Sequence, residues 1–367
     1  MGKGRNLSNM KRAASFFVVI ILLITCTGAI SACAGLNRYS YTFLGAFDTS
    51  VTITAFCKNE SDFEKLCTTV EAEMLSYHRY FDIYNTYEGI TNLKSINDNA
   101  GKGAVEAAQE IIDLLNFGIS MHSYSEGRLN IMFGAVLSIW HEYRENGINS
   151  PDSAVLPERS ELLRASEHCD IGSLIVDSEA GTVEITDEQA SIDVGAIAKG
   201  FAVERVCDTL MELGYDGVLI NAGGNIGTIG TKPGGEEWNT AVQNPFVIYE
   251  NLSGADAIPS GVTGSENITY KSIAGQSLVT SGDYQRYYTV DGIRYHHIID
   301  PETLFPADYV KSVTVCVGSS ELADALSTML FLMPPDEAIE FAEGSDSIDL
   351  EVFIVKATGE TLSTQGW

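Results

Sequence analysis

The chain contains segments with helical hydrophobic periodicity and segments with strand periodicity, but the two kinds do not alternate regularly along the sequence. This order excludes some classes of fold. Apolar residues recur at helical spacing over 62–80 and again over 104–124. The segment 43–56 alternates as a strand does, with apolar side chains at every second position. A doubly wound α/β sheet needs regular alternation of strand and helix. The sequence therefore favours an α+β fold with a mixed sheet and flanking helices.

The remaining periodic segments are shorter, and no linker divides them. We expect helices at 197–213 and 322–331, and strands within 174–193, 217–229, 277–280, 287–290, 312–317 and 351–357. The polar, proline-containing segment 144–161 predicts a surface excursion, and 246–270 an irregular loop. We expect one compact unit over 41–360, with an active cleft between its lobes.

The N-terminal segment is typical of export. Basic residues precede an apolar run over 13–24 that is too short for a stable membrane span, so 1–32 is interpreted as a secretory signal. Small residues before Cys33 resemble a bacterial lipobox, which would make Cys33 the lipidated start of a tether over 33–40. Plain cleavage near Ala32 and an uncleaved anchor are the alternatives. The expected location is the extracytoplasmic face of the cell membrane, held there by the lipid.

Charge limits the partners. The chain has 22 Lys and Arg against 50 Asp and Glu, which gives a formal net charge of −28. A protein this acidic lacks the basic face that nucleic acid requires, and it is repelled by anionic lipid headgroups. An anionic small ligand would need a metal ion, a lysine or oriented backbone amides. The cysteines after Cys33 form no CxxC pair, which argues against a zinc site, while one disulfide stays open.

Polar residues concentrate near the end of the chain, in 280–288 and 295–301. The second segment contains the adjacent pair His296 and His297. Neighbouring residues of a strand point to opposite faces, so only one of the two can face a site. A structural turn with hydrogen-bonded histidines is the alternative interpretation.

Two further segments carry groups suited to phosphate or metal. Over 193–200, two glycines and Lys199 stand where a helix opens, and free amides at a helix start can meet a phosphate. Asp324 and Thr328 lie four residues apart, so on a helix they share a face and could both bind a hard cation. A glycine-rich turn over 221–227 lacks the dinucleotide fingerprint. Each segment taken alone also fits an ordinary helix start or turn.

Taken together and in order, these segments resemble the ApbE family, the FAD:protein FMN transferases. The resemblance runs from about residue 43 to 332 and is carried by Asp-x-Gly-x-x-x-Lys-Gly (193–200), Thr-Ser-Gly-Asp-Tyr-x-Arg (280–286), His-His-Ile-x-Asp-Pro (296–301) and Ala-Asp-x-Leu-Ser-Thr (323–328). It implies FAD as substrate, bound in a cleft with Mg²⁺ on its pyrophosphate. It also implies an acceptor protein with a motif similar to Ser/Thr-Gly-Ala-Ser/Thr. The segment 253–256 of this chain lacks the last hydroxyl of that motif, so self-modification is not expected.

The resemblance also implies roles for individual residues. The metal would be held by the Ala196 carbonyl, Asp324 and the Thr328 hydroxyl, and His297 would be the base. The flavin contacts would be Phe47, Tyr84, Arg128, Leu129, Asn130, Asp193, Lys199 and Ile298.

The chain departs from the family pattern at three places, of which the first two bear on the flavin contacts and the third on the loop near His297. The family's Met-Gly-Thr is Phe47-Asp48-Thr49 here, its Phe-Asp pair is Leu129-Asn130, and Leu304 replaces a glycine in the turn after Asp300-Pro301.

The expected reaction is Mg²⁺-dependent transfer of FMN from FAD to a Thr or Ser hydroxyl, with release of AMP. An FAD pyrophosphatase would use the same residues, with water as the attacking group. A flavin-binding lipoprotein without catalytic activity is the alternative from another class, and it predicts FAD bound unchanged.

Overall fold

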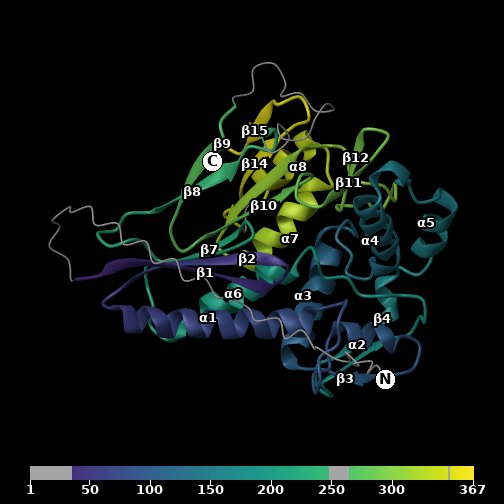
Figure 1. Ribbon diagram of the computed structural model, residues 1–367, viewed down its shortest axis with the longest axis horizontal. Coiled ribbons are helices and arrows are strands. Elements are labelled where there is room, and N and C mark those ends of the chain that lie inside the picture. Colours follow the sequence, from purple (N-terminus) through teal and green to yellow (C-terminus); the bar gives the residue numbers. More distant parts are fainter. Residues whose placement is uncertain (1–34, 248–263, 346–347) are drawn as a thin grey trace, which may run out of the picture.

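A large antiparallel sheet organises the protein. The computed structural model describes residues 35–247, 264–345 and 348–367. Within them, an eight-stranded sheet has the order β1-β2-β6-β7-β10-β13-β14-β15 (Figure 1). These strands are β1 (Asn37–Ala46), β2 (Thr49–Cys57), β6 (Val218–Ala222), β7 (Asn225–Ile229), β10 (Ser277–Gly282), β13 (Ser312–Val317), β14 (Glu351–Val355) and β15 (Thr361–Ser363). The α+β class is confirmed, with the finer finding that all ladders of this sheet are antiparallel where we expected a mixed sheet.

Smaller elements complete the fold. The helices are α1 (Glu60–Phe81), α2 (Leu93–Asp98), α3 (Gln109–Tyr124), α4 (Gly134–Asn149), α5 (Arg159–Ser166), α6 (Ala198–Glu212), α7 (Ser320–Phe331) and α8 (Pro335–Glu343), with short 3-10 turns at Pro151–Ser153 and Ile171–Ser173. The small sheets join β3 (Val105–Glu106), β5 (Thr182–Ile185) and β4 (Leu174–Asp177); β8 (Trp238–Gln243) and β9 (Asn267–Ile273); and β11 (Tyr287–Val290) and β12 (Ile293–His296).

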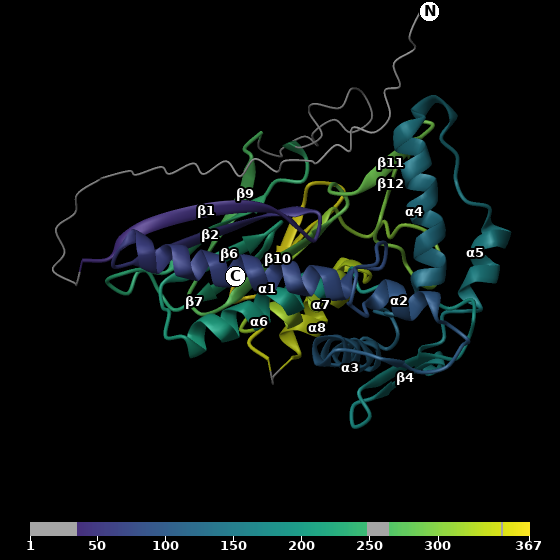
Figure 2. The same cartoon turned by 60° about the horizontal axis from the view of Figure 1, so that its bottom comes forward.

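Helices cover one face of the main sheet. α1 contacts β1 and β2, α6 contacts β7, and α7 contacts β10 and β13. Figure 2 shows α1 lying along the β1–β2 hairpin, with α4 and α5 set apart at one end of the molecule. Every residue of β13 is buried: Val313 and Val315 face the helical core, while Cys316 packs with Trp238 on the other face. The centre of the sheet is therefore covered on both sides.

Several predicted strands and helices have different boundaries in the structure, because turns interrupt them. The strand expected over 43–56 is the hairpin β1–β2, and the strand expected over 217–229 is the hairpin β6–β7, which turns at Gly223 and Gly224 with positive φ. Gly223 has no room for a side chain, since a Cβ there would lie 2.2 Å from the Thr49 hydroxyl. The helix expected from residue 104 begins at Gln109, after the short strand β3.

The expected surface excursion over 144–161 is wrong at its start, because α4 continues through Asn149. α4 packs on the β11–β12 hairpin, and the Trp140 Nε1–H donates to the Leu304 carbonyl at 2.9 Å. That contact is between residues far apart in the sequence, which local periodicity does not report.

The ends of the expected unit also shift. Strand β1 begins at Asn37, so part of the expected tether belongs to the sheet, and β15 lies beyond residue 360. The signal over 1–32, Cys33 and most of the 246–270 loop lie outside the described residues. Among the helices that the structure describes, none is long and apolar enough to cross a membrane. The cysteines of the described ranges are free thiols.

Candidate active site

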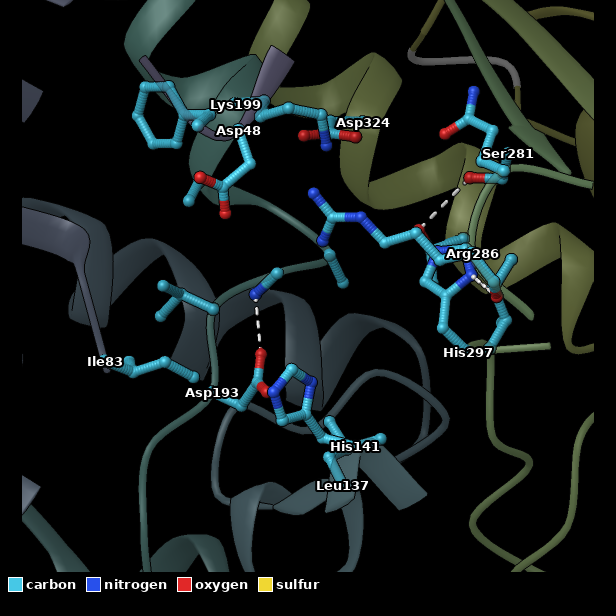
Figure 3. A pocket seen from close by; sticks show the side chains of 18 of the residues that line it. Asp48, Ile83, Leu137, His141, Asp193, Lys199, Ser281, Arg286, His297 and Asp324 are labelled. Carbon is cyan, nitrogen blue, oxygen red and sulfur yellow. Dashed lines mark hydrogen bonds between the residues drawn. The ribbon is translucent and has the colours of Figure 1, made fainter. Parts of the chain in front are cut away.

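One cavity of about 600 Å³ brings together the residues that the family resemblance implied for the metal, the flavin and the base. Its walls come from the β1–β2 turn, the end of α1, the segment leading into α4, the start of α6, the end of β10, the segment after β12, and α7. The predicted residues on its wall are Phe47, Tyr84, Arg128, Leu129, Asn130, Asp193, Ala196, Lys199, His297, Ile298, Asp324 and Thr328. Figure 3 shows Asp324 and Lys199 together at one side, with Asp193 and His141 across from them. The volume suits a small-molecule ligand.

A hydrogen bond between two helices assembles the oxygen ligands. The Gly200 amide, in the first turn of α6, donates to Asp324 Oδ2 of α7 at 2.8 Å. An ordinary helix would use this amide to bind the carbonyl four residues earlier, which is that of Ala196. In the described part of the chain no amide donates to the Ala196 carbonyl. The start of α6 thus leaves a free carbonyl next to a buried carboxylate.

The donor set suits a hard divalent cation. Asp324 is only 4% exposed, and one of its oxygens is not used by Gly200. Thr328 lies one turn along α7, and its hydroxyl is 3.3 Å from that of Ser281. Carboxylate, carbonyl and hydroxyl oxygens are ligands that Mg²⁺ accepts, usually with waters and phosphate oxygens. Among the described residues, no group of three or more His, Cys, Asp or Glu side chains is arranged to hold a metal ion, so this donor set relies on a single carboxylate together with neutral oxygens.

Burial disfavours the ionised form of Asp324. Desolvation raises the pKa of this carboxyl group, while Lys199, the Gly200 amide and the Asn225 side chain act in the opposite direction. Desolvation outweighs these three groups, so an added cation would stabilise the carboxylate. The residues present therefore fit a magnesium ion.

His297 is held as a neutral ring with one free nitrogen. Its Nδ1 lies 3.2 Å from the Arg286 carbonyl oxygen, which can only accept, so Nδ1 carries the proton and Nε2 is unprotonated. Burial lowers the pKa of His297 well below its ordinary value, and the positive charges of Arg286, Arg144 and Lys199 lower it further. The arrangement can accept a proton at Nε2.

The neighbouring His296 points away from the cavity, as the strand rule requires. Its Nε2–H donates to the Ala307 carbonyl at 2.7 Å, and its Nδ1 accepts from the Ile298 amide at 3.2 Å. Both ring nitrogens are used within a buried environment. The expectation that only one of the two histidines faces the site is consistent with this geometry.

The residues expected to contact flavin line the cavity wall, but they differ in exposure and in whether their polar groups are already hydrogen-bonded. Phe47 is half-buried and packs edge-on against His78 at 5.7 Å, whereas Tyr84 is 54% exposed at the mouth. Leu129 is buried in the core. The Asn130 amide donates to the Cys169 carbonyl at 2.8 Å and accepts from the Met132 amide at 2.9 Å, so this side chain is committed to the backbone.

Several lining residues were not predicted. Asp48, His78, His141, Arg144 and Arg286 all border the cavity. Arg286 is the last residue of the Thr-Ser-Gly-Asp-Tyr-x-Arg motif, but no role is expected for it from the sequence. His141 and Arg144 are three residues apart on α4, a spacing that places two side chains on one helix face, and only the helix pattern could have indicated them.

A cavity that combines oxygen donors suited to a hard cation, a lysine and a neutral imidazole is typical of enzymes that act on phosphate groups. The ApbE family model matches residues 47–354. The chain therefore belongs to the ApbE family.

Curated relatives are similar in sequence to this chain over most of its length. An FAD:protein FMN transferase of Klebsiella pneumoniae (strain 342) is 29% identical over 287 residues, which is 78% of this chain and 82% of that protein. Another protein of that name, from Treponema pallidum (strain Nichols), is 31% identical over 255 residues, 66% of this chain and 64% of its own.

Solved structures share the fold. The crystal structure of the ApbE protein of Thermotoga maritima superposes with a TM-score of 0.74 at 26% identity, covering 90% of this chain and 98% of that one. The flavin transferase ApbE of Vibrio cholerae has a TM-score of 0.69 at 22% identity, covering 89% and 98%, which supports the fold alone.

Proposed function

We propose that this protein transfers FMN from FAD to a Thr or Ser hydroxyl of an acceptor protein at the extracytoplasmic face of the membrane, with Mg²⁺ and with release of AMP. The observation that carries the proposal is the convergence of separated motifs on one cavity, with Asp324, Ala196, Thr328 and His297 on its wall. The names of the curated relatives support the same activity.

The chain's own groups account for binding and proton transfer. Asp324, the Ala196 carbonyl and Thr328 would hold a magnesium ion, which would neutralise pyrophosphate charge. Lys199 adds a positive charge on the same side of the cavity (Figure 3). The acceptor hydroxyl oxygen forms a bond to the FMN phosphorus, and the P–O bond to the AMP phosphate breaks. His297 Nε2 takes the hydroxyl proton, and AMP leaves with the bridging oxygen.

A direct test mixes the full chain with FAD, Mg²⁺ and a peptide that carries the Ser/Thr-Gly-Ala-Ser/Thr motif. Mass spectrometry is expected to find the peptide heavier by FMN, together with free AMP. FMN and AMP with an unmodified peptide would instead establish a pyrophosphatase, and unchanged FAD a binding protein.

Two variants separate the proposed roles. Asp324→Asn is expected to abolish Mg²⁺-dependent turnover of FAD, because one carboxylate ligand is lost. His297→Ala is expected to leave FAD binding near the wild-type value while slowing transfer by about 10²–10⁴-fold. Transfer at the wild-type rate by either variant would contradict its assigned role.

A further inference from the structure

Three cationic side chains without an ion pair converge on the cavity. Lys199 comes from α6, Arg144 from α4, and Arg286 from the segment between β10 and β11. Over 35–247, 264–345 and 348–367 no carboxylate lies within ion-pair distance of any of them, whereas Arg128, which also lines the cavity, pairs with Glu126 at 3.7 Å. The same wall also carries Asp48, Asp82, Asp193 and Asp324, and Asp193 attracts both arginines from beyond ion-pair distance. Because none of these carboxylates pairs with the three cations in the described chain, their donors are available to an anionic ligand.

Arg286 stands apart from the proposed metal site. Figure 3 shows Lys199 next to Asp324, while the Arg286 side chain extends into the space between that pair and His141. Burial lowers the pKa of Arg144, and the charge of Arg286 lowers it further. Both guanidinium groups line the same cavity, and an anion bound between them would offset their mutual repulsion.

His141 fixes the orientation of Arg144. An Arg144 Nη2–H donates to His141 Nδ1 at 2.6 Å, so this ring nitrogen is unprotonated and the proton is on Nε2. That tautomer is the reverse of the one at His297, and it removes His141 as a base at Nε2. The His141 ring lies against Tyr84, with centroids 5.0 Å apart, which limits its rotation. Arg144 therefore presents its other donors in a set direction.

We propose that Arg144 and Arg286 form a second phosphate-binding subsite, a guanidinium pair that binds phosphate oxygens without a metal ion. Planar guanidinium groups match phosphate oxygens through paired hydrogen bonds, and neither arginine uses its donors on a carboxylate in the described chain. His141 is a positioning residue that orients Arg144. That the bound phosphate belongs to FAD rests on the proposed function.

The test measures binding of single probes to the full chain in EDTA, which removes the divalent-ion contribution. FMN is compared with riboflavin, and AMP with adenosine, by titration calorimetry or flavin fluorescence. Arg144→Gln and Arg286→Gln are each expected to lower the affinity for FMN or for AMP by about tenfold or more. The affinities for riboflavin and adenosine are expected to stay unchanged. A loss confined to FMN or to AMP supports the subsite and tells which half of the dinucleotide it holds.

Matched variants guard against a general effect. Arg164→Gln removes the same charge from an exposed position on α5 and is expected to bind all probes as the wild type does. His141→Leu removes the acceptor and is expected to weaken phosphate binding, whereas His141→Asn restores an acceptor oxygen and is expected to recover part of it.

Three results would overturn the subsite. They are equal affinity of the arginine variants and wild type for FMN and AMP, an equal loss for riboflavin and adenosine, and a wild-type protein that binds phosphorylated and unphosphorylated probes alike or binds none. None of these measurements requires turnover of FAD. A failed transferase assay with intact arginine-dependent binding would therefore reject the proposed function and keep the subsite.

Discussion

At the scale of single residues, two departures from the family pattern fall on left-handed backbone. Asp48 has φ +53° and Leu304 φ +64°, at positions where the resembling family carries glycine. Such φ values cost a non-glycine residue about 1 kcal/mol or more. Asp48 is exposed, whereas Leu304 is buried beside Trp140. This chain thus retains backbone strain at a turn near His297 in exchange for an apolar contact.

The variant Leu304→Gly measures whether backbone strain or apolar burial at this position has the larger effect on stability. The substitution relieves about 1 kcal/mol of strain, but it removes a buried side chain whose loss costs about 2–5 kcal/mol, so we expect net destabilisation of about 1–4 kcal/mol. Urea unfolding measures the free energy. Asp48→Gly, which loses no buried surface, is the control and is expected to change stability by less than about 1 kcal/mol. A more stable Leu304→Gly protein would mean that strain dominates.

The proposed role of His297 as the base determines the expected pH profile. A base must be neutral to accept a proton, and the pKa of His297 lies well below its ordinary value because of burial and the nearby cations. Activity falls only where pH drops through this lowered pKa. We therefore expect kcat/KM for FAD to stay level through pH 6.5 and to decline at lower pH. A midpoint near the ordinary histidine value, about 6.5, would contradict this account.

At the scale of elements, the contact of α6 with α7 is set by a glycine. A Cβ at Gly200 would lie 2.3 Å from the Ser320 carbonyl oxygen and 2.4 Å from the Asp324 Cβ, and the first of these is rigid backbone. Gly200→Ala must therefore separate the helices and lengthen the bond from this amide to Asp324.

We expect Gly200→Ala to destabilise the protein by about 1–3 kcal/mol, as overpacking does, and to weaken Mg²⁺-dependent activity more than tenfold. Thermal unfolding and FAD turnover measure the two effects. Gly318→Ala is the matched control, since a Cβ there meets nothing within 4 Å. Similar behaviour of the two variants would show that the helices can shift at no cost.

At the scale of the whole molecule, the net charge of −28 acts against the folded state, while the cavity depends on attraction. Salt screens both. We expect added NaCl, up to about 0.5 M, to raise Tm by about 2–4 °C while it weakens FMN binding in EDTA. Calorimetry of the ligand-free protein and flavin titration at the same salt concentrations check the opposite signs. Parallel changes would indicate that self-repulsion is not significant.

The sequence predicted the local features well. The helices carrying Lys199 and Asp324 were found because their apolar spacing and polar motifs lie within one turn or two of each other. Arg144 was assigned to a surface excursion because its side-chain direction depends on the packing of α4 against the β11–β12 hairpin, through Trp140 and the Leu304 turn. The tautomers of His141 and His297 likewise depend on partners that only the fold brings near.

The Gly200 amide has a final consequence. Because this amide already bonds to Asp324 on the neighbouring helix, the carboxylate proposed to bind Mg²⁺ is positioned during folding rather than by an arriving ion. Magnesium binding would then require loss of water from the cation, with little rearrangement of the chain. Deuterium uptake at this amide should be slow both before and after magnesium is added, and a site organised by the ion would instead show strong protection only afterwards.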